Sequence, residues 1–163
     1  MQCTNPVYLR DKDMDVPCGK CLGCLISYRR MWSARMLHEA EYWDDAIFVT
    51  LTYSDEFVPK AYLTGRLTLK KEDLQKFFKR LRRRLDFESF GPSVRVRKIR
   101  YYACGEYGDK NEYRKGKIGT ERPHYHMIIF GMRADRNDRN IIAECWPYAD
   151  WSNPSIWSSV PIF

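Results

Sequence analysis

The sequence contains only three histidines, and none of its apolar runs approaches the roughly 20 residues needed to cross a bilayer. Its amino-terminal stretch, residues 1–10, lacks the hydrophobic region of a signal peptide, so we do not expect a secreted protein. It also lacks internal repeats and low-complexity tracts. These absences favour a protein of a reducing cytoplasm, in which the six cysteines do not form a disulfide framework.

The composition is that of a folded, basic protein. The 163 residues are one domain's worth of chain, and 44% are hydrophobic and 15% aromatic, which predicts a packed core rather than disorder. The net charge of +7 and the isoelectric point near 9.1 indicate a polyanionic partner. Nucleic acid is the first interpretation of this charge and an anionic membrane surface the second.

Hydrophobic periodicity predicts alternating helices and strands after a segment rich in Cys, Pro and Gly at residues 1–24, which we expect to be a loop. We expect helices over 25–44, 70–86 and 135–145, strands over 46–53, 94–106 and 124–131, and a small hairpin around Gly65. The loop 107–123 joins two of the strands into an antiparallel pair. Strands with helices on one face predict an α+β sandwich. We therefore divide the chain into a Cys-rich segment, 1–24, and one domain, 25–163.

Two of the histidines lie in the string Arg122-Pro123-His124-Tyr125-His126, at the start of a predicted strand. Residues i and i+2 of a strand point to the same face, about 7 Å apart, so two imidazoles can share one ion. Glu106 ends the preceding strand and can lie beside them if the two strands form a hairpin. Two imidazoles and one carboxylate suit Mg²⁺ or Mn²⁺. The alternative is that both histidines are ordinary residues at a sheet edge.

Four of the cysteines, Cys3, Cys18, Cys21 and Cys24, are candidate ligands of a structural ion. Zinc bound by four thiolates would organise a segment that has no periodicity of its own. The C-x2-C-x2-C spacing is only half that of a zinc ribbon, so an iron–sulfur cluster or free thiols remain alternatives. We expect Cys104 and Cys145 to be single buried core residues.

The predicted helix 70–86 carries far more positive charge than solubility requires. Eight cations face only Glu72 and Asp73 within 70–84, so contact with DNA phosphates is the favoured role and a solvated face the alternative. The cations that we assign to DNA contact are Lys76, Lys79, Arg80, Arg82, Arg83 and Arg84. Tyr101, Tyr102 and Tyr107 are candidates for stacking on unpaired bases.

Several strings together resemble the replication initiators of small single-stranded DNA phages. These are residues 48–53 (FVTLTY), 105–108 (GEYG) and 122–131 (RPHYHMIIFG), with Cys18, Cys21 and Cys24, then Trp32, Arg35 and Glu39, and the string 78–82 (FKRLR). The match is closest to the gokushovirus branch of the Microviridae, within the HUH endonuclease superfamily. The resemblance spans most of the chain, from Cys3 to about Trp146.

This resemblance implies a five-stranded antiparallel sheet of RRM-like topology with helices packed on it. It implies that His124 and His126 hold Mg²⁺ or Mn²⁺, with Glu106 as the third ligand. Thr50 and Thr52, on the neighbouring strand, and Arg122 are then further candidates for contact with DNA. The implied reaction is attack of a tyrosine hydroxyl on a phosphodiester, which leaves a 5′-phosphotyrosine and a free 3′-OH.

The tyrosine that the family places after the histidines, followed by a lysine, is not evident. Tyr148 is the sole tyrosine after Phe130, and no lysine follows Lys117. Tyr148 is therefore a weak candidate, and Tyr8 or Tyr28 would serve if the order were that of relaxases. The simpler expectation is that the chain is truncated and that the nucleophile lies beyond Phe163.

The sequence thus predicts a phage replication initiator that nicks and rejoins single-stranded DNA at a replication origin. We expect it to act in the host bacterial cytoplasm with the host replication machinery, and not at a membrane. The alternative is a non-catalytic nucleic-acid-binding module built on a zinc site, in which the histidines are structural.

Overall fold

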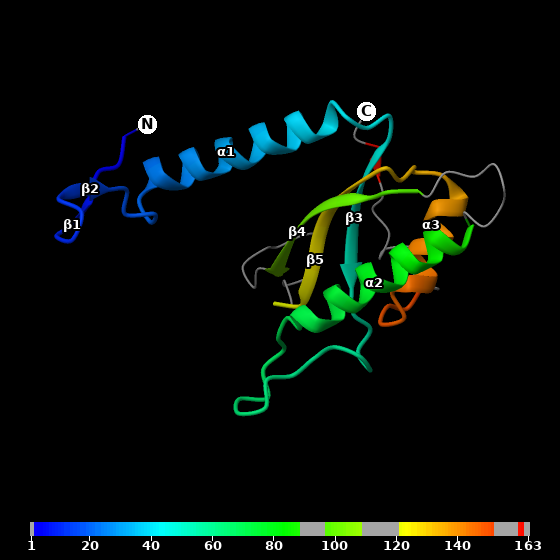
Figure 1. Ribbon diagram of the computed structural model, residues 1–163. Helices are drawn as coiled ribbons and strands as arrows, with labels where there is room; N and C mark the ends of the chain where they lie inside the picture. Colours follow the sequence, from blue (N-terminus) through cyan, green and yellow to red (C-terminus); the bar gives the residue numbers. More distant parts are fainter. Residues whose placement is uncertain (1, 89–96, 109–120, 152–159, 162–163) are drawn as a thin grey trace, which may run out of the picture. The chain divides into compact units, whose positions relative to one another are not determined.

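The computed structural model describes residues 2–88, 97–108, 121–151 and 160–161 (Figure 1). The chain divides into two compact units, Met1–Tyr42 and Trp43–Phe163. The boundary that the sequence predicts after residue 24 falls within the first unit, because a helix continues directly from the cysteine segment. None of the described helices is long and apolar enough to cross a membrane.

The first unit contains a small hairpin and one long helix. Strands β1 (Val7–Leu9) and β2 (Met14–Val16) pair antiparallel, and the turn between them is closed by a hydrogen bond from Lys12 N to Leu9 O of 3.3 Å. The expectation of a plain loop over 1–24 was therefore wrong, since a tight turn at 10–13 brings two short extended stretches together. Helix α1 (Leu22–Ala40) begins and ends earlier than the predicted helix over 25–44.

The second unit is built on an antiparallel sheet. Its strands are β3 (Ala46–Thr52), β4 (Arg100–Tyr107), β5 (Pro123–Phe130) and the two-residue β6 (Val160–Pro161), in the order β4-β5-β3-β6. The predicted α+β class is confirmed. A five-stranded sheet is not seen in the part of the chain that the structure describes. Residues 97–99, expected to be extended strand, precede β4, and 94–96 lie outside the described residues.

Helices α2 (Lys71–Glu88) and α3 (Arg136–Cys145) cover one face of this sheet, which we call the helix face (Figure 1). Side chains alternate along each strand, so every second residue of β3 and β5 enters the core between sheet and helices. The predicted apolar stripe of α2 lies against them. The core contains Ile47, Val49, Leu51, Met127 and Ile129 from the sheet, Phe77, Phe78, Leu81 and Leu85 from α2, and Ile141, Ile142 and Trp146 from α3 and its end.

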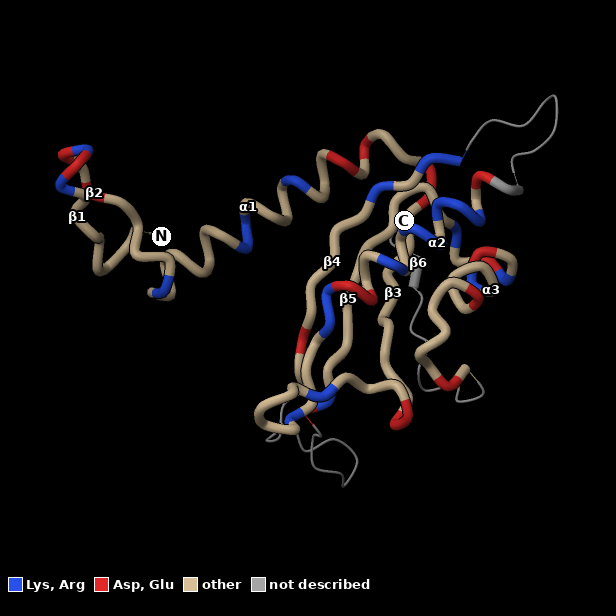
Figure 2. The backbone as a smooth tube through the Cα atoms, turned by 60° about the horizontal axis from the view of Figure 1, so that its bottom comes forward, with Lys and Arg blue, Asp and Glu red and all other residues tan. Residues whose placement is uncertain are grey.

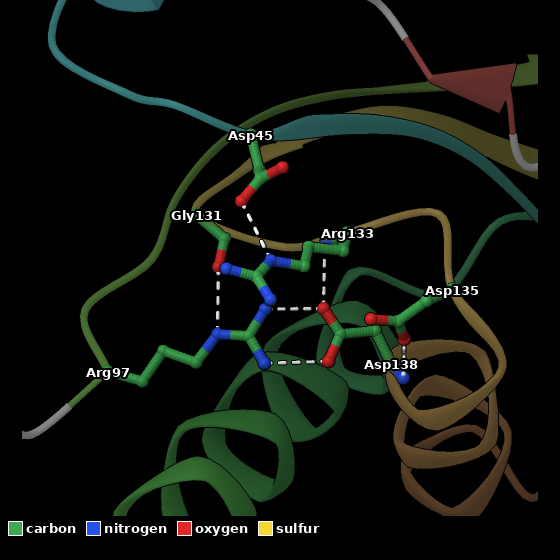
Figure 3. A network of polar contacts seen from close by, with 6 residues as sticks. All are labelled: Asp45, Arg97, Gly131, Arg133, Asp135 and Asp138. Atoms are coloured by element: carbon green, nitrogen blue, oxygen red, sulfur yellow. Dashed lines mark hydrogen bonds and ion pairs between the residues drawn. The ribbon is translucent and has the colours of Figure 1, made fainter. Parts of the chain in front are cut away.

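One carboxylate fixes the corner where β4 starts, β5 ends and α3 begins (Figure 3). Asp138, whose residue exposure is only 1%, accepts two hydrogen bonds from the guanidinium of Arg97 and one from the backbone N–H of Arg133. Arg97 Nε also donates to Gly131 O at 3.0 Å, and Asp135 caps α3 by accepting from Asp138 N at 2.8 Å. This network anchors α3 to the sheet at the end remote from the histidines.

Candidate metal centre and nucleic-acid interface

The register of three strands places the predicted ligands side by side. His124 of β5 is opposite Glu106 of β4 and opposite Thr52 of β3. His126 is likewise opposite Cys104 and Thr50. Directly opposed residues of paired strands share a face, so all six side chains lie on the face away from α2 and α3, which we call the histidine face.

The ligand atoms of Glu106, His124 and His126 all lie within 4.8 Å of one another. The two Nε2 atoms are 3.1 Å apart, and Glu106 Oε2 is 3.4 Å from Nε2 of His126. The side chains are 29% exposed for His126 and 60% for Glu106, so the centre borders solvent and a substrate oxygen has access to it.

Hydrogen bonds on the far side of each imidazole aim the Nε2 atoms. Nδ1 of His124 donates to the carbonyl oxygen of Arg122 at 2.9 Å, because a carbonyl can only accept. Nδ1 of His126 is 2.9 Å from the hydroxyl of Thr50. In the neutral ring of His124, Nε2 therefore carries a lone pair, and this lone pair faces His126.

The electrostatics keep His126 neutral. Burial, followed by the positive charge that His124 would carry, lowers the pKa of His126, and the nearby carboxylate of Glu106 only partly offsets this. Neutral imidazole is the form that binds a cation.

This donor set fits a hard divalent ion. Two ligands at right angles around an ion at about 2.1 Å lie about 3.0 Å apart, close to the 3.1 Å between the Nε2 atoms. Two nitrogens and a carboxylate leave coordination positions for water or a phosphate oxygen. His124, His126 and Glu106 would hold the ion, and that they do so stays a prediction.

Two neighbours on the histidine face were not anticipated as part of the site. The ring of Phe48 stacks on the imidazole of His126, with centroids 5.5 Å apart and planes at 26°. Cys104 is exposed rather than buried, so that expectation was wrong, whereas Cys145 is buried as predicted. Alternation along the paired strands was the signal for both, since each residue lies on the same face as His126.

Arg122, assigned to DNA contact from the sequence, is engaged within the fold. Its Nε and Nη2 donate to the carbonyl oxygen of Tyr53 at 3.1 and 2.7 Å, and its Nη1 pairs with the carboxylate of Asp55. The side chain therefore links the start of β5 to the end of β3, next to His124.

The basic helix α2 lies on the helix face, so its cations and the histidines are on opposite sides of the sheet (Figures 1 and 2). Arg80 Nε donates to Cys145 O at 2.8 Å, and Arg84 Nε pairs with Glu144 at 3.0 Å, so both hold α3. The guanidinium of Arg82 covers the stacked rings of Phe78 and Tyr101. Lys76, Lys79 and Arg83 are exposed.

The tyrosine candidates are not brought to the histidines. Tyr148 packs among Tyr53, Phe57 and Trp146, with ring centroids 5.9, 6.1 and 4.9 Å away, and Arg80 lies over its ring. Tyr53 and Trp146 belong to the core on the helix face, so Tyr148 is on the side away from His124. Tyr8 and Tyr28 belong to the first unit, where Tyr8 donates to Asp13 and Tyr28 contacts Trp32 edge to face.

The four amino-terminal cysteines converge in the first unit, with all sulfurs within 4.8 Å of one another. Sγ of Cys21 is 3.8 Å from that of Cys3, and Sγ of Cys18 is 3.9 Å from that of Cys24. Four sulfurs at about 2.3 Å around Zn²⁺ lie about 3.8 Å apart, so the spacing suits a tetrahedral site. Hydrogen bonds from the backbone of Thr4 and Cys24 lower the pKa of Cys21 to about 5, which favours a thiolate.

An α+β domain with an antiparallel sheet, two histidines and a glutamate on one face, and a basic helix on the other defines the class of this protein. The family model of the phage replication-associated protein ORF2 matches residues 46–153, and the chain belongs to this family. It is a replication initiator of the Microviridae type, as the sequence strings indicated.

Two curated relatives are also named replication-associated proteins. Replication-associated protein VP4 of Bdellovibrio phage phiMH2K is 38% identical over 129 residues, which cover 78% of this chain and 35% of the relative. Replication-associated protein ORF2 of Spiroplasma virus 4 is 34% identical over 146 residues, 86% of this chain and 39% of the relative. The chain thus spans little more than a third of the length of these relatives. No solved structure matches it significantly.

Proposed function

We propose that this chain carries the metal-binding nicking site of a rolling-circle replication initiator. The observation that supports the proposal most strongly is the convergence of Nε2 of His124, Nε2 of His126 and the carboxylate of Glu106 on one accessible point. A divalent ion bound there would act as a Lewis acid towards the phosphate of the strand to be cut. The substrate is single-stranded DNA at the phage replication origin, and the reaction takes place in the host bacterial cytoplasm beside the host replication machinery.

The residues of this chain divide the work of binding between them. Thr50 orients His126 through Nδ1, and Arg122 holds the end of β5 that presents His124. Lys76, Lys79 and Arg83 are free of described hydrogen bonds and ion pairs and are available to phosphates, whereas Arg80 and Arg84 act chiefly by holding α3. We keep the five-stranded, RRM-like sheet and the two-part domain division as part of this proposal.

The nucleophile in this proposal is a tyrosine whose hydroxyl oxygen bonds to phosphorus while the bond to the 3′ oxygen breaks. The 3′ oxygen takes up a proton and leaves as the hydroxyl that primes synthesis. Tyr148 does not fit this role, because its ring is enclosed by aromatic side chains on the helix face. A phosphotyrosine adduct mapped to Tyr148 in an origin-oligonucleotide assay would contradict this reading.

Titration with Mn²⁺ tests the metal site, with binding followed by calorimetry. We expect His124→Ala and His126→Ala each to weaken Mn²⁺ binding about a hundredfold or more, since loss of even an outer-shell partner costs about 10- to 100-fold. His38→Ala is the matched control, because His38 is the third histidine and lies on α1 in the other unit. Metal-dependent binding of single-stranded DNA should fail in the same two variants and persist in the control.

The second candidate is a non-catalytic nucleic-acid-binding module in which Cys3, Cys18, Cys21 and Cys24 hold zinc. The sulfur spacing in the first unit favours it, and it assigns no metal to the histidines. If His124→Ala and wild type bind Mn²⁺ and single-stranded DNA equally, this second candidate is correct and the nicking site is not.

A further inference from the structure

The segment between β3 and α2 contains a preformed turn, Pro59–Thr68, which we call the tip hairpin. Lys60 and Leu67 form a β-bridge, Thr68 N donates to Pro59 O at 2.9 Å, and Ala61 N donates to Arg66 O at 2.8 Å. Gly65 N closes the end by donating to Ala61 O at 2.8 Å, and Gly65 has a positive φ of 64°, which favours glycine. The hydrogen bonds hold this turn in one conformation.

The end of the tip hairpin presents large apolar side chains to solvent. Tyr62 is 100% exposed and Leu63 is 92% exposed, which are the highest values among the large hydrophobic residues of the described chain. Neither side chain contributes to the core of the second unit. A rigid turn that displays an aromatic and an aliphatic side chain fits a surface that receives both when a partner binds.

The tip hairpin is attached at the end of the sheet where the histidines lie. Leu69 N, directly after the hairpin, donates to the hydroxyl of Tyr107 at 3.1 Å. The side chain of Leu69 also fills the space beside Gly105, where an added Cβ would lie 2.5 Å from it. Gly105 and Tyr107 flank Glu106 in β4, so the base of the hairpin is fixed beside the candidate metal centre. Figure 1 shows the turn projecting beyond that end of the sheet.

We infer that the tip hairpin binds DNA at the junction between a duplex and the unpaired strand, with Tyr62 stacked on the last base pair and Leu63 beside it. This inference rests on the proposed function, which places the unpaired strand on the histidine face. The last pair of a duplex offers an open π-face, whereas insertion between two stacked pairs first has to separate them. The hairpin would hold the duplex end at a fixed distance from the metal centre.

Charge favours DNA over a protein partner at this place. Lys60 and Arg66 are the only charged residues of Pro59–Thr68, both are exposed, and both lie within a few residues of Tyr62. Cations beside an exposed aromatic ring are the combination with which proteins contact the phosphates and bases at the end of a strand. The net charge of +7 for the whole chain is consistent with such a partner.

Fluorescence anisotropy with three labelled oligonucleotides tests the inference: a forked duplex with an unpaired arm, the unpaired strand alone and a blunt duplex. We expect Tyr62→Ala to weaken binding of the forked DNA about tenfold, and to leave binding of the single strand unchanged. Tyr62→Phe should bind like wild type, because the ring is retained. Tyr42→Ala is the matched control, since Tyr42 is 82% exposed and lies in the first unit.

A second readout separates this inference from the proposed function. With 2-aminopurine in the last base pair, wild type and His124→Ala should both change its fluorescence on binding, and Tyr62→Ala should not. If the change needs His124 as well, or if Tyr62→Ala lowers affinity for all three oligonucleotides equally, the junction assignment is wrong. It is also wrong if Tyr62→Ala binds forked DNA like wild type, or changes the oligomeric state instead.

Discussion

The hydroxyl of Thr50 lies 2.9 Å from Nδ1 of His126, across the pairing of β3 with β5. Thr50 is thus a positioning residue for the imidazole and does not itself belong to the set of candidate ligands. An outer-shell hydrogen bond of this kind fixes the orientation of the ring and raises its basicity.

Thr50→Val should weaken binding of Mn²⁺ about tenfold, because it removes the hydroxyl and keeps the shape of the side chain. Thr52→Val is the matched control. The Oγ1 of Thr52 is buried and has no hydrogen-bond partner among the described residues, so its loss should leave Mn²⁺ affinity unchanged and stability unchanged or slightly higher. Equal losses of affinity in the two variants would contradict the role given to Thr50. Calorimetry and thermal unfolding measure both quantities.

The outward stripe of α2 should bind DNA phosphates through Lys76, Lys79 and Arg83. We expect the triple change of these residues to Gln to lower the slope of log affinity against log salt by about 2 for single-stranded DNA, which is about 0.7 for each lost phosphate contact. Anisotropy titrations at several salt concentrations give this slope.

The arginines that hold α3 supply the control for this experiment. Arg80→Gln should lower the melting temperature, because it removes the hydrogen bond to Cys145 O, and should change the salt slope little. If Arg80→Gln changes the slope as much as the triple variant does, phosphate contact is not specific to the outward stripe.

The cysteine cluster should hold one structural zinc ion per chain. Cys21→Ser should abolish zinc content, measured by elemental analysis, because it removes one of four thiolates. It should also speed amide exchange in β1, β2 and the start of α1. Cys104→Ser is the control and should keep the zinc, since Cys104 lies on β4 in the other unit. Iron with visible absorption would favour a cluster instead, and metal-free wild type would favour free thiols.

Asp138→Asn should destabilise the second unit by about 3 kcal/mol, the low end for breaking a buried ion pair, because the side chain of Arg97 keeps 30% exposure. Asp45→Asn is the control: its ion pair with Arg133 is exposed, and we expect a loss of less than about 1 kcal/mol. Urea unfolding measures both. Equal effects of the two substitutions would show that burial of Asp138 does not matter.

The sequence was sufficient to predict the class of the fold and the strands at 46–53 and 124–131, because strong alternation and β-branched residues mark them. The predicted place of Glu106 beside the histidines depended on one further assumption, that a hairpin joins β4 and β5, and the register agrees with it. Family membership followed from several strings taken together in their order.

Other features depend on contacts between distant segments that no local pattern reveals. Helical periodicity identifies the buried stripe of α2, but it does not tell that Arg80 and Arg84 meet α3, some sixty residues later. Cysteine is usually buried, so Cys104 was assigned to the core, yet its place opposite His126 decides its exposure. The hairpin β1–β2 was missed because each strand has only three residues.

The pairing of β5 with both neighbours also limits how the candidate metal centre can be lost. A slip of one residue would carry both imidazoles into the core and turn Tyr125 and Met127 outward, at the cost of the whole apolar face. The ligand positions therefore cannot drift by degrees, and they disappear only when the sheet unfolds. An ion that binds only the folded sheet will then raise the melting temperature with its concentration, so thermal denaturation can rank metals without any assay of DNA.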